Sequence, residues 1–199
     1  MNFKSIFLIS SILILGISCQ QKKECCSKDK QTQITAISDE SLYQLNTDWL
    51  NQDGANIKLN SLQGKIVVTA MVFTHCESAC PRIVSDMQRI EKAINANPNV
   101  VFLLISMDPE RDTPARFREF SQERQLGKNW VMISSNQMAT DEVANVLGVK
   151  IKKLSDGGFD HSNSIFVLDP NGVVIHTQEG LEQEPKPLID IIYKELEKF

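Results

Sequence analysis

The feature that most constrains this chain is an unbroken apolar run, Ile66–Phe73 (IVVTAMVF), that leads into two cysteines. A run without polar alternation predicts a strand that is buried on both faces. Cys76 and Cys80 follow it with three residues between them, and Pro81 comes directly after. Because proline suits the first turn of a helix, we expect a helix to start near residue 79. Cys80 would then lie at the positive end of this helix, which favours its thiolate form. The alternatives are a structural disulfide or two buried thiols.

The segments after the cysteines predict a strand–helix–strand unit. Apolar residues at helical spacing continue to Asn95–Pro98, where Asn and Pro stop the helix, and a second apolar run follows at Val100–Ile105. Such a unit places its two strands parallel, with a right-handed crossover. Thr113 and Pro114 then predict the start of a second helix, which Gly127 would end.

The rest of the chain predicts further short elements around the same core. The expected elements are a hairpin of Leu42–Leu50 with Asn56–Leu59, a short strand at Trp130–Ile133, a helix capped by Thr140 and ended by Gly148, a loop at residues 149–158, a hairpin of Ser164–Leu168 with Val173–Thr177, and a final helix from Pro187. This order predicts an α/β, thioredoxin-like fold, in which helices flank a central mixed sheet that follows an N-terminal hairpin.

The N-terminus has the pattern of a targeting segment. Residues 1–18 read as a signal peptide, with a basic start and an apolar run that is short for a membrane span, and Cys19 is the expected lipidation site. Leu15 lies four places before this cysteine, whereas lipoprotein signals usually have leucine three places before, so a cleaved secretory signal or an uncleaved anchor stays open. Residues 19–40 are polar and predict a flexible tether, which includes Cys25 and Cys26. We therefore expect residues 41–199 to form one domain in the cell envelope, anchored to a membrane and facing the extracytoplasmic side.

Charge argues against a nucleic-acid partner. The 199 residues carry a formal net charge of −4, and the charged residues form no long run of one sign. A nucleic-acid surface needs a basic patch, so we expect no such partner.

A soft-metal site is the chemistry that the residues favour. Parallel strands gather their functional loops at their carboxyl ends, which is where Cys76 and Cys80 lie. If Ser164–Leu168 runs antiparallel to the first core strand, His161 comes to the same edge. Two thiolates and an imidazole favour Cu(I) and can also hold Cu(II), whereas structural zinc or an iron–sulfur cluster needs four ligands. Asp160 is a candidate for orienting the imidazole.

The other soft-ligand candidates are weaker. His75 should point away from Cys76 if strand alternation persists, and His176 lies in an ordinary hairpin strand. Met71 lies inside the apolar strand and is expected in the core.

Three motifs resemble the Sco/SenC family of copper chaperones, which help to assemble the copper centre of cytochrome c oxidase. They are FTHCESACP at Phe73–Pro81, SMDPERDTP at Ser106–Pro114 and DHSNSIFVLDPNG at Asp160–Gly172. The resemblance spans residues 42–199 and implies Cys76, Cys80 and His161 as copper ligands. Glu77-Ser78-Ala79 stands between the cysteines where many members begin with Pro-Asp, which changes the loop and removes no ligand. The second motif is expected to be structural or to face a partner.

The leading hypothesis is therefore a metallochaperone that is not an enzyme. It would deliver copper to the copper-binding subunit of cytochrome c oxidase and would need a thiol reductant protein to open a Cys76–Cys80 disulfide. The alternative is a thiol–disulfide oxidoreductase that reduces cysteines of a partner, although such enzymes usually have two residues between their cysteines. A redox-sensing module that uses the same site also stays open. A peroxidase is disfavoured, because Thr74 lies two residues before Cys76 and no Thr-x-x-Cys arrangement is present.

Overall fold

The computed structural model describes residues 38–199. The predicted signal peptide, the tether up to residue 37, and Cys19, Cys25 and Cys26 lie outside these residues. Within residues 38–199, no helix combines the length and the apolar character that crossing a bilayer requires.

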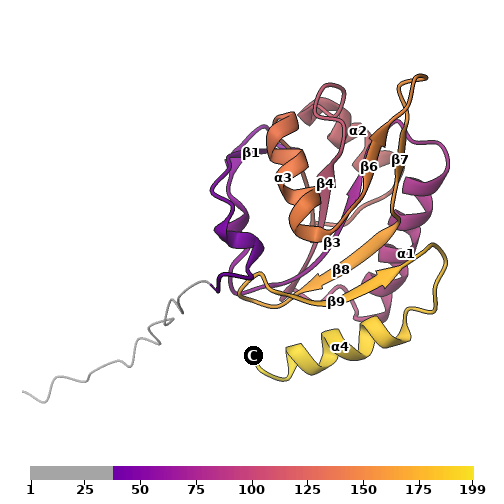
Figure 1. The fold of residues 1–199 in the computed structure, drawn as a ribbon. Coiled ribbons are helices and arrows are strands. Elements are labelled where there is room, and N and C mark those ends of the chain that lie inside the picture. The colour runs from indigo at the N-terminus through magenta and orange to yellow at the C-terminus, as the bar shows by residue number, and fades with distance from the viewer. Residues whose placement is uncertain (1–37) are drawn as a thin grey trace, which may run out of the picture. The chain divides into compact units, whose positions relative to one another are not determined.

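The described part of the chain alternates strands and helices along most of its length (Figure 1). In chain order the elements are β1 (Trp49–Asn51), β2 (Asn56–Ile57), β3 (Ile66–Val72), α1 (Ala79–Ala93), β4 (Val100–Ser106), α2 (Pro114–Glu123), β5 (Trp130–Ser134), α3 (Gln137–Leu147), β6 (Ile151–Lys153), β7 (Phe159–His161), β8 (Ser164–Leu168), β9 (Val174–Glu179) and α4 (Lys186–Leu196), with short 3-10 helices at Leu42–Gln44 and Leu59–Leu62.

The central sheet is mixed, as the sequence predicts. Its seven strands lie in the order β2-β1-β5-β4-β3-β8-β9. Strands β3, β4 and β5 are parallel, whereas β8 pairs with β3 in antiparallel fashion, with Val68 opposite Val167. The start of β8 therefore lies at the edge of the sheet where β3 ends.

Strand β3 is the centre of the core. All of its residues from Ile66 to Val72 are buried, because β4 and β8 cover its two edges and helices α1 and α4 contact it. Burial of each aliphatic side chain contributes about 1.5–3 kcal/mol to the free energy of folding, so β3 is firmly held in the core. Its position therefore sets where the next residues leave the sheet. Met71 is 2% exposed and belongs to this core, as predicted.

The helix boundaries follow local capping chemistry. The Thr113 side chain accepts a hydrogen bond from the backbone N–H of Arg116, and Pro114 occupies the first turn of α2, as predicted. The predicted cap at Thr140 was wrong, because the Asn136 side chain caps α3 and Thr140 is buried inside that helix. Helix α2 also ends at Glu123, before Gly127.

Two other predictions needed correction. The N-terminal hairpin exists, but its strands are only β1 and β2, since the Ser41 side chain caps a 3-10 helix at Leu42–Gln44. Residues 149–158, expected to be a loop, contain β6, which pairs with β7 in a separate two-stranded sheet. His161 thus lies on a small hairpin of its own.

Candidate metal centre

The turn after β3 places the two cysteines on either side of the start of α1. Cys76 lies in the turn, where its N–H donates to the carbonyl oxygen of Phe73 at 3.2 Å. The Ser78 side chain makes no capping bond to α1, and the Cys76 sulfur instead accepts the N–H of Cys80 at 3.4 Å. A sulfur therefore occupies the position of an N-cap oxygen, where the positive end of the helix stabilises a negative charge.

This arrangement makes the two thiols unequal. A hydrogen bond from the Cys80 side chain, helped by the backbone N–H groups of Cys80, Ser78 and Ala79, lowers the pKa of Cys76 to about 4, although partial burial opposes the shift. The same bond to Cys76, together with burial, raises the pKa of Cys80 well above its ordinary value. The expectation that Cys80 is the favoured thiolate was therefore wrong, because Cys80 lies inside the first turn while Cys76 lies in front of it.

His161 reaches this turn from the β6–β7 hairpin. It ends β7, with two residues between it and the start of β8, and the antiparallel pairing of β8 with β3 brings it to the carboxyl end of β3. Its Nε2 lies 3.6 Å from Cys80 Sγ, and its Nδ1 lies 3.1 Å from the carbonyl oxygen of Ser162. Because a carbonyl oxygen only accepts, Nδ1 carries the proton, and the lone pair of Nε2 faces the sulfur.

The separation of sulfur and nitrogen suits a shared metal ion. An ion about 2.3 Å from sulfur and about 2.0 Å from nitrogen holds those atoms roughly 3.5 Å apart at a tetrahedral angle, close to the separation seen here. In residues 38–199, no three His, Cys, Asp or Glu side chains are already gathered as a finished metal cage. The structure instead provides two paired contacts, Cys76 with Cys80 and Cys80 with His161, in which Cys80 is the shared member.

The remaining candidate ligands occupy different surroundings. Asp160 is exposed, and the contact that orients the imidazole comes from Ser162. His75 turns towards Asp112, with 3.8 Å between Nδ1 and Oδ1. His176 pairs with Val167 in the β8–β9 hairpin.

Aromatic packing supports the position of His161. Phe73 follows β3 directly and is 5% exposed. Its ring contacts Phe159 edge to face at 5.0 Å between centroids, and it lies 6.2 Å from the His161 ring. Both ends of β7 therefore pack on the residue that leads into the cysteine turn.

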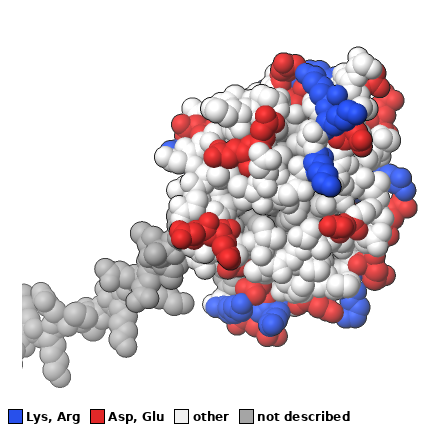
Figure 2. Space-filling view, in the orientation of Figure 1, with Lys and Arg blue, Asp and Glu red and all other residues white. Residues whose placement is uncertain are grey.

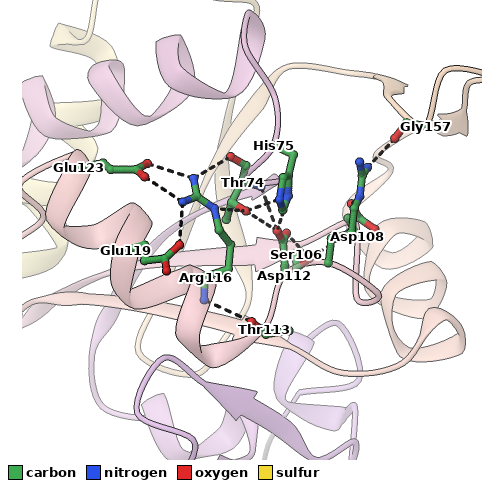
Figure 3. A network of polar contacts seen from close by, with 11 residues as sticks. Thr74, His75, Ser106, Asp108, Asp112, Thr113, Arg116, Glu119, Glu123 and Gly157 are labelled. Carbon is green, nitrogen blue, oxygen red and sulfur yellow. Dashed lines mark hydrogen bonds and ion pairs between the residues drawn. The ribbon is translucent and has the colours of Figure 1, made fainter.

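A buried polar network holds the turn from below (Figure 3). Asp112 is 1% exposed and accepts hydrogen bonds from Thr74 N at 3.1 Å, Thr74 Oγ1 at 2.6 Å and Ser106 Oγ at 2.6 Å. Burial raises the pKa of the Asp112 carboxyl, and these donors oppose that shift. Arg116 donates to Thr74 Oγ1 at 3.1 Å and to the Thr74 carbonyl oxygen at 3.3 Å. Thr74 is thereby fixed two residues before Cys76.

The motif at Ser106–Pro114 was expected to be structural or to face a partner. The structure shows a structural contact, in which Asp112 accepts a hydrogen bond from Thr74 across 38 positions of sequence. On the face in Figure 2, acidic and basic side chains are interspersed and separated by uncharged surface, as the sequence suggests.

Comparisons with known proteins agree on one family. The SCO1/SenC family profile matches residues 38–197. The SCO1 protein homolog of Bacillus subtilis (strain 168) is 31% identical over 140 residues, which make up 68% of this chain and 72% of that protein.

Solved structures show the same fold. A SCO1/SenC family lipoprotein from Bacillus anthracis superposes with a TM-score of 0.70 at 24% identity, covering 75% of this chain and 92% of the other. Arabidopsis thaliana ScoI with copper bound gives a TM-score of 0.67 at 25% identity, covering 76% and 96%. The central mixed sheet flanked by helices is therefore the arrangement of the Sco thioredoxin-like structures.

Proposed function

This chain belongs to the SCO1/SenC family, and from that premise we propose that it takes up copper at Cys76, Cys80 and His161 and delivers it to cytochrome c oxidase. The observation that carries the proposal is the 3.6 Å contact between Cys80 Sγ and His161 Nε2, made by an imidazole whose Nδ1–H is held by the Ser162 carbonyl. A thiol pair and an oriented imidazole form a soft ligand set.

Uptake begins with unequal thiols. The Cys76 thiolate, with its pKa near 4, is ready to bind Cu(I) without losing a proton. Cys80 holds its proton until the metal arrives, so binding of one Cu(I) by both sulfurs releases one proton to solvent. The contact of His161 Nδ1 with the Ser162 carbonyl oxygen leaves Nε2 as the nitrogen that would bind the metal.

Delivery is by ligand exchange with a cysteine-bearing acceptor, the copper-binding subunit of the oxidase. Cys76 is partly exposed, whereas Cys80 is fully buried, so an incoming thiolate meets the copper from the side of Cys76. A disulfide between Cys76 and Cys80 removes both ligands, and a thiol reductant protein must restore them. The segment before residue 38 would tether the domain to a membrane, facing the cell envelope, with Cys19 as the lipidation site.

A thiol–disulfide reductase is the second candidate, and the unequal thiols favour it. The Cys76 thiolate would attack a partner disulfide and release one partner thiolate. Cys80 would then lose its proton and attack the Cys76 sulfur, which frees the second partner thiolate and leaves a Cys76–Cys80 disulfide. His161 has no role in these steps, so its replacement separates the two functions.

The test is an anaerobic Cu(I) titration of the full chain, reduced, with Cys19, Cys25 and Cys26 replaced by serine. We expect one copper per chain. His161→Ala should weaken retention against a competing chelator at least tenfold, while His176→Ala, a histidine outside the site, should leave it unchanged. Equal retention by both variants, with reduction of a partner disulfide intact in His161→Ala, would favour the reductase.

A further inference from the structure

The cysteine turn and the β6–β7 hairpin both contact a third segment, which contributes none of the proposed metal ligands. It is the connection between β4 and α2, residues 107–113, which we call the β4–α2 loop. Two of its residues, Arg111 and Asp112, are adjacent in sequence and contact different segments: Arg111 donates to Gly157 in the β6–β7 hairpin, and Asp112 accepts from Thr74 in the cysteine turn (Figure 3).

Asp112 is the residue of this loop that contacts the cysteine turn. Its carboxylate is buried and accepts both the backbone N–H and the hydroxyl of Thr74. Hydrogen bonds to a charged acceptor contribute about 1.5–3 kcal/mol each, and leaving this carboxylate without them would be costly. The turn that carries Cys76 is therefore fixed to the β4–α2 loop.

Arg111 is the residue of this loop that contacts the hairpin carrying His161. Strands β6 and β7 pair with each other and lie outside the seven-stranded sheet. At the tip of this hairpin, the Gly157 carbonyl oxygen accepts a hydrogen bond from Arg111 Nη2, while Arg111 Nε pairs with the Asp108 carboxylate. One guanidinium thus joins the hairpin tip to the loop through two of its nitrogens.

Burial decides which contact holds the hairpin tip. The Asp108 side chain is 1% exposed, so its pairing with Arg111 is anchored inside the domain. A second tie, Lys153 to Glu110 at 3.1 Å, joins side chains that are 56% and 77% exposed, and such a pair contributes little. Arg111 is therefore the tie at the tip that has a buried partner, although its bond to Gly157 lies at the surface. At the base of the hairpin, Phe159 packs on Phe73, and Ile151 packs against the core.

Ser106 joins the two halves of the loop. Its hydroxyl donates to Asp112 at 2.6 Å and accepts the backbone N–H of Asp108 at 2.9 Å. The Asp112 carboxylate, which holds the cysteine turn, and the backbone of Asp108, whose carboxylate pairs with Arg111, thus contact the same oxygen.

We propose that the β4–α2 loop sets the distance between the thiols and the imidazole, with Arg111 as a positioning residue for His161 and Asp112 as one for Cys76. The copper part of this assignment rests on the function proposed above. The mechanical part, that Arg111 holds the β6–β7 hairpin closed, concerns the protein without metal and can be tested separately.

The first test is hydrogen exchange on the full chain, reduced and without copper, comparing Arg111→Lys with wild type. Lysine keeps a positive charge for Asp108, but its single nitrogen cannot also reach Gly157. The matched control is Arg118→Lys, because Arg118 Nη1 also donates to a backbone carbonyl, that of Gln52 at 2.7 Å, away from the site. We expect amides of residues 151–161 to exchange about tenfold faster in Arg111→Lys and at the wild-type rate in Arg118→Lys. Unchanged exchange in Arg111→Lys overturns the proposal.

The second test is a double-mutant cycle on Cu(I) affinity. Arg111→Lys should weaken binding by up to about tenfold in a chain that has His161, and should cause no further loss in a His161→Ala background. Losses that add would show that Arg111 does not act through His161, which overturns its positioning role. A wild-type chain that retains no copper refutes the proposed function instead, and the exchange experiment then decides alone whether Arg111 holds the hairpin.

Discussion

The unequal thiols give the most direct prediction, which concerns the reactivity of Cys76 at low pH. With a pKa near 4, Cys76 is about nine-tenths thiolate at pH 5, whereas a thiol with the ordinary value of 9.0 is ionised in about one molecule in ten thousand. A thiolate of lower pKa is a weaker nucleophile, with a slope of about 0.4–0.5, so five units cost roughly 100- to 300-fold in intrinsic rate. The net expectation at pH 5 is that Cys76 reacts on the order of 30- to 90-fold faster than free cysteine.

The assay is alkylation of the reduced full chain by iodoacetamide from pH 3 to pH 9, with each cysteine quantified by peptide mapping. The sign follows from the lowered pKa: the reactive thiolate is present above about pH 4 and is lost as the pH falls through that value. The Cys76 rate should therefore be flat from pH 8 to pH 5. Cys80, fully buried and with a raised pKa, should stay unmodified while Cys76 reacts.

A substitution tests the cause of the shift. Cys80→Ala removes the side-chain hydrogen bond that lowers the pKa of Cys76 most, so the midpoint should move upward, although the backbone N–H groups keep it below the ordinary value. His161→Ala leaves that bond in place and serves as the control. A Cys76 midpoint near 9 in the wild-type protein, or modification of Cys80 before Cys76, would refute the reasoning.

Two matched pairs of substitutions test the packing and polar contacts of the fold by chemical denaturation. Gly172 and Gly54 both have positive φ angles of about 80°, but a Cβ at Gly172 would lie 2.6 Å from the Tyr43 ring, whereas one at Gly54 meets nothing within 4 Å. Gly54→Ala should therefore lower the free energy of unfolding by about 1 kcal/mol, and Gly172→Ala should lower it clearly more. Equal losses of stability would contradict this account. Thr69 Oγ1 is buried with no hydrogen-bond partner, so Thr69→Val should leave the free energy of unfolding unchanged or raise it. Thr74→Val removes a hydrogen bond to the Asp112 carboxylate and should lower the free energy of unfolding by about 1.5–3 kcal/mol. The reverse order would show that the network around Asp112 is not stabilising.

The sequence predicted those features of the site that depend mainly on residues close together in the chain. The apolar run Ile66–Phe73 can only be satisfied by burial on both faces, so it identified β3. Thr113 and Pro114 began α2 where capping chemistry predicts. The antiparallel position of Ser164–Leu168 was a topological inference, and it brought His161 to the thiols as expected.

The sequence did not predict the helix boundaries and strand pairings that depend on residues far apart in the chain. Asn136 rather than Thr140 caps α3 because Thr140 is buried against the end of β4, where its hydroxyl reaches the Ser106 carbonyl oxygen at 3.5 Å. The strand β6 was not predicted, because its pattern is mostly polar and its pairing partner β7 is what makes it a strand.

The sequence by itself determined the buried strand that leads into the two cysteines and the apolar segment that follows His161, whereas the antiparallel pairing of those strands, which brings the three side chains to one edge of the sheet, is tertiary. Only the tertiary structure decided which sulfur carries the charge and what holds the imidazole in place. Both depend on distances of a few ångströms between groups far apart in the chain, namely the N–H groups in front of Cys76, the carbonyl oxygen of Ser162 and the guanidinium of Arg111. Hydrogen bonds weaken steeply with distance and angle, so a pattern of residue types cannot specify them until the chain has folded.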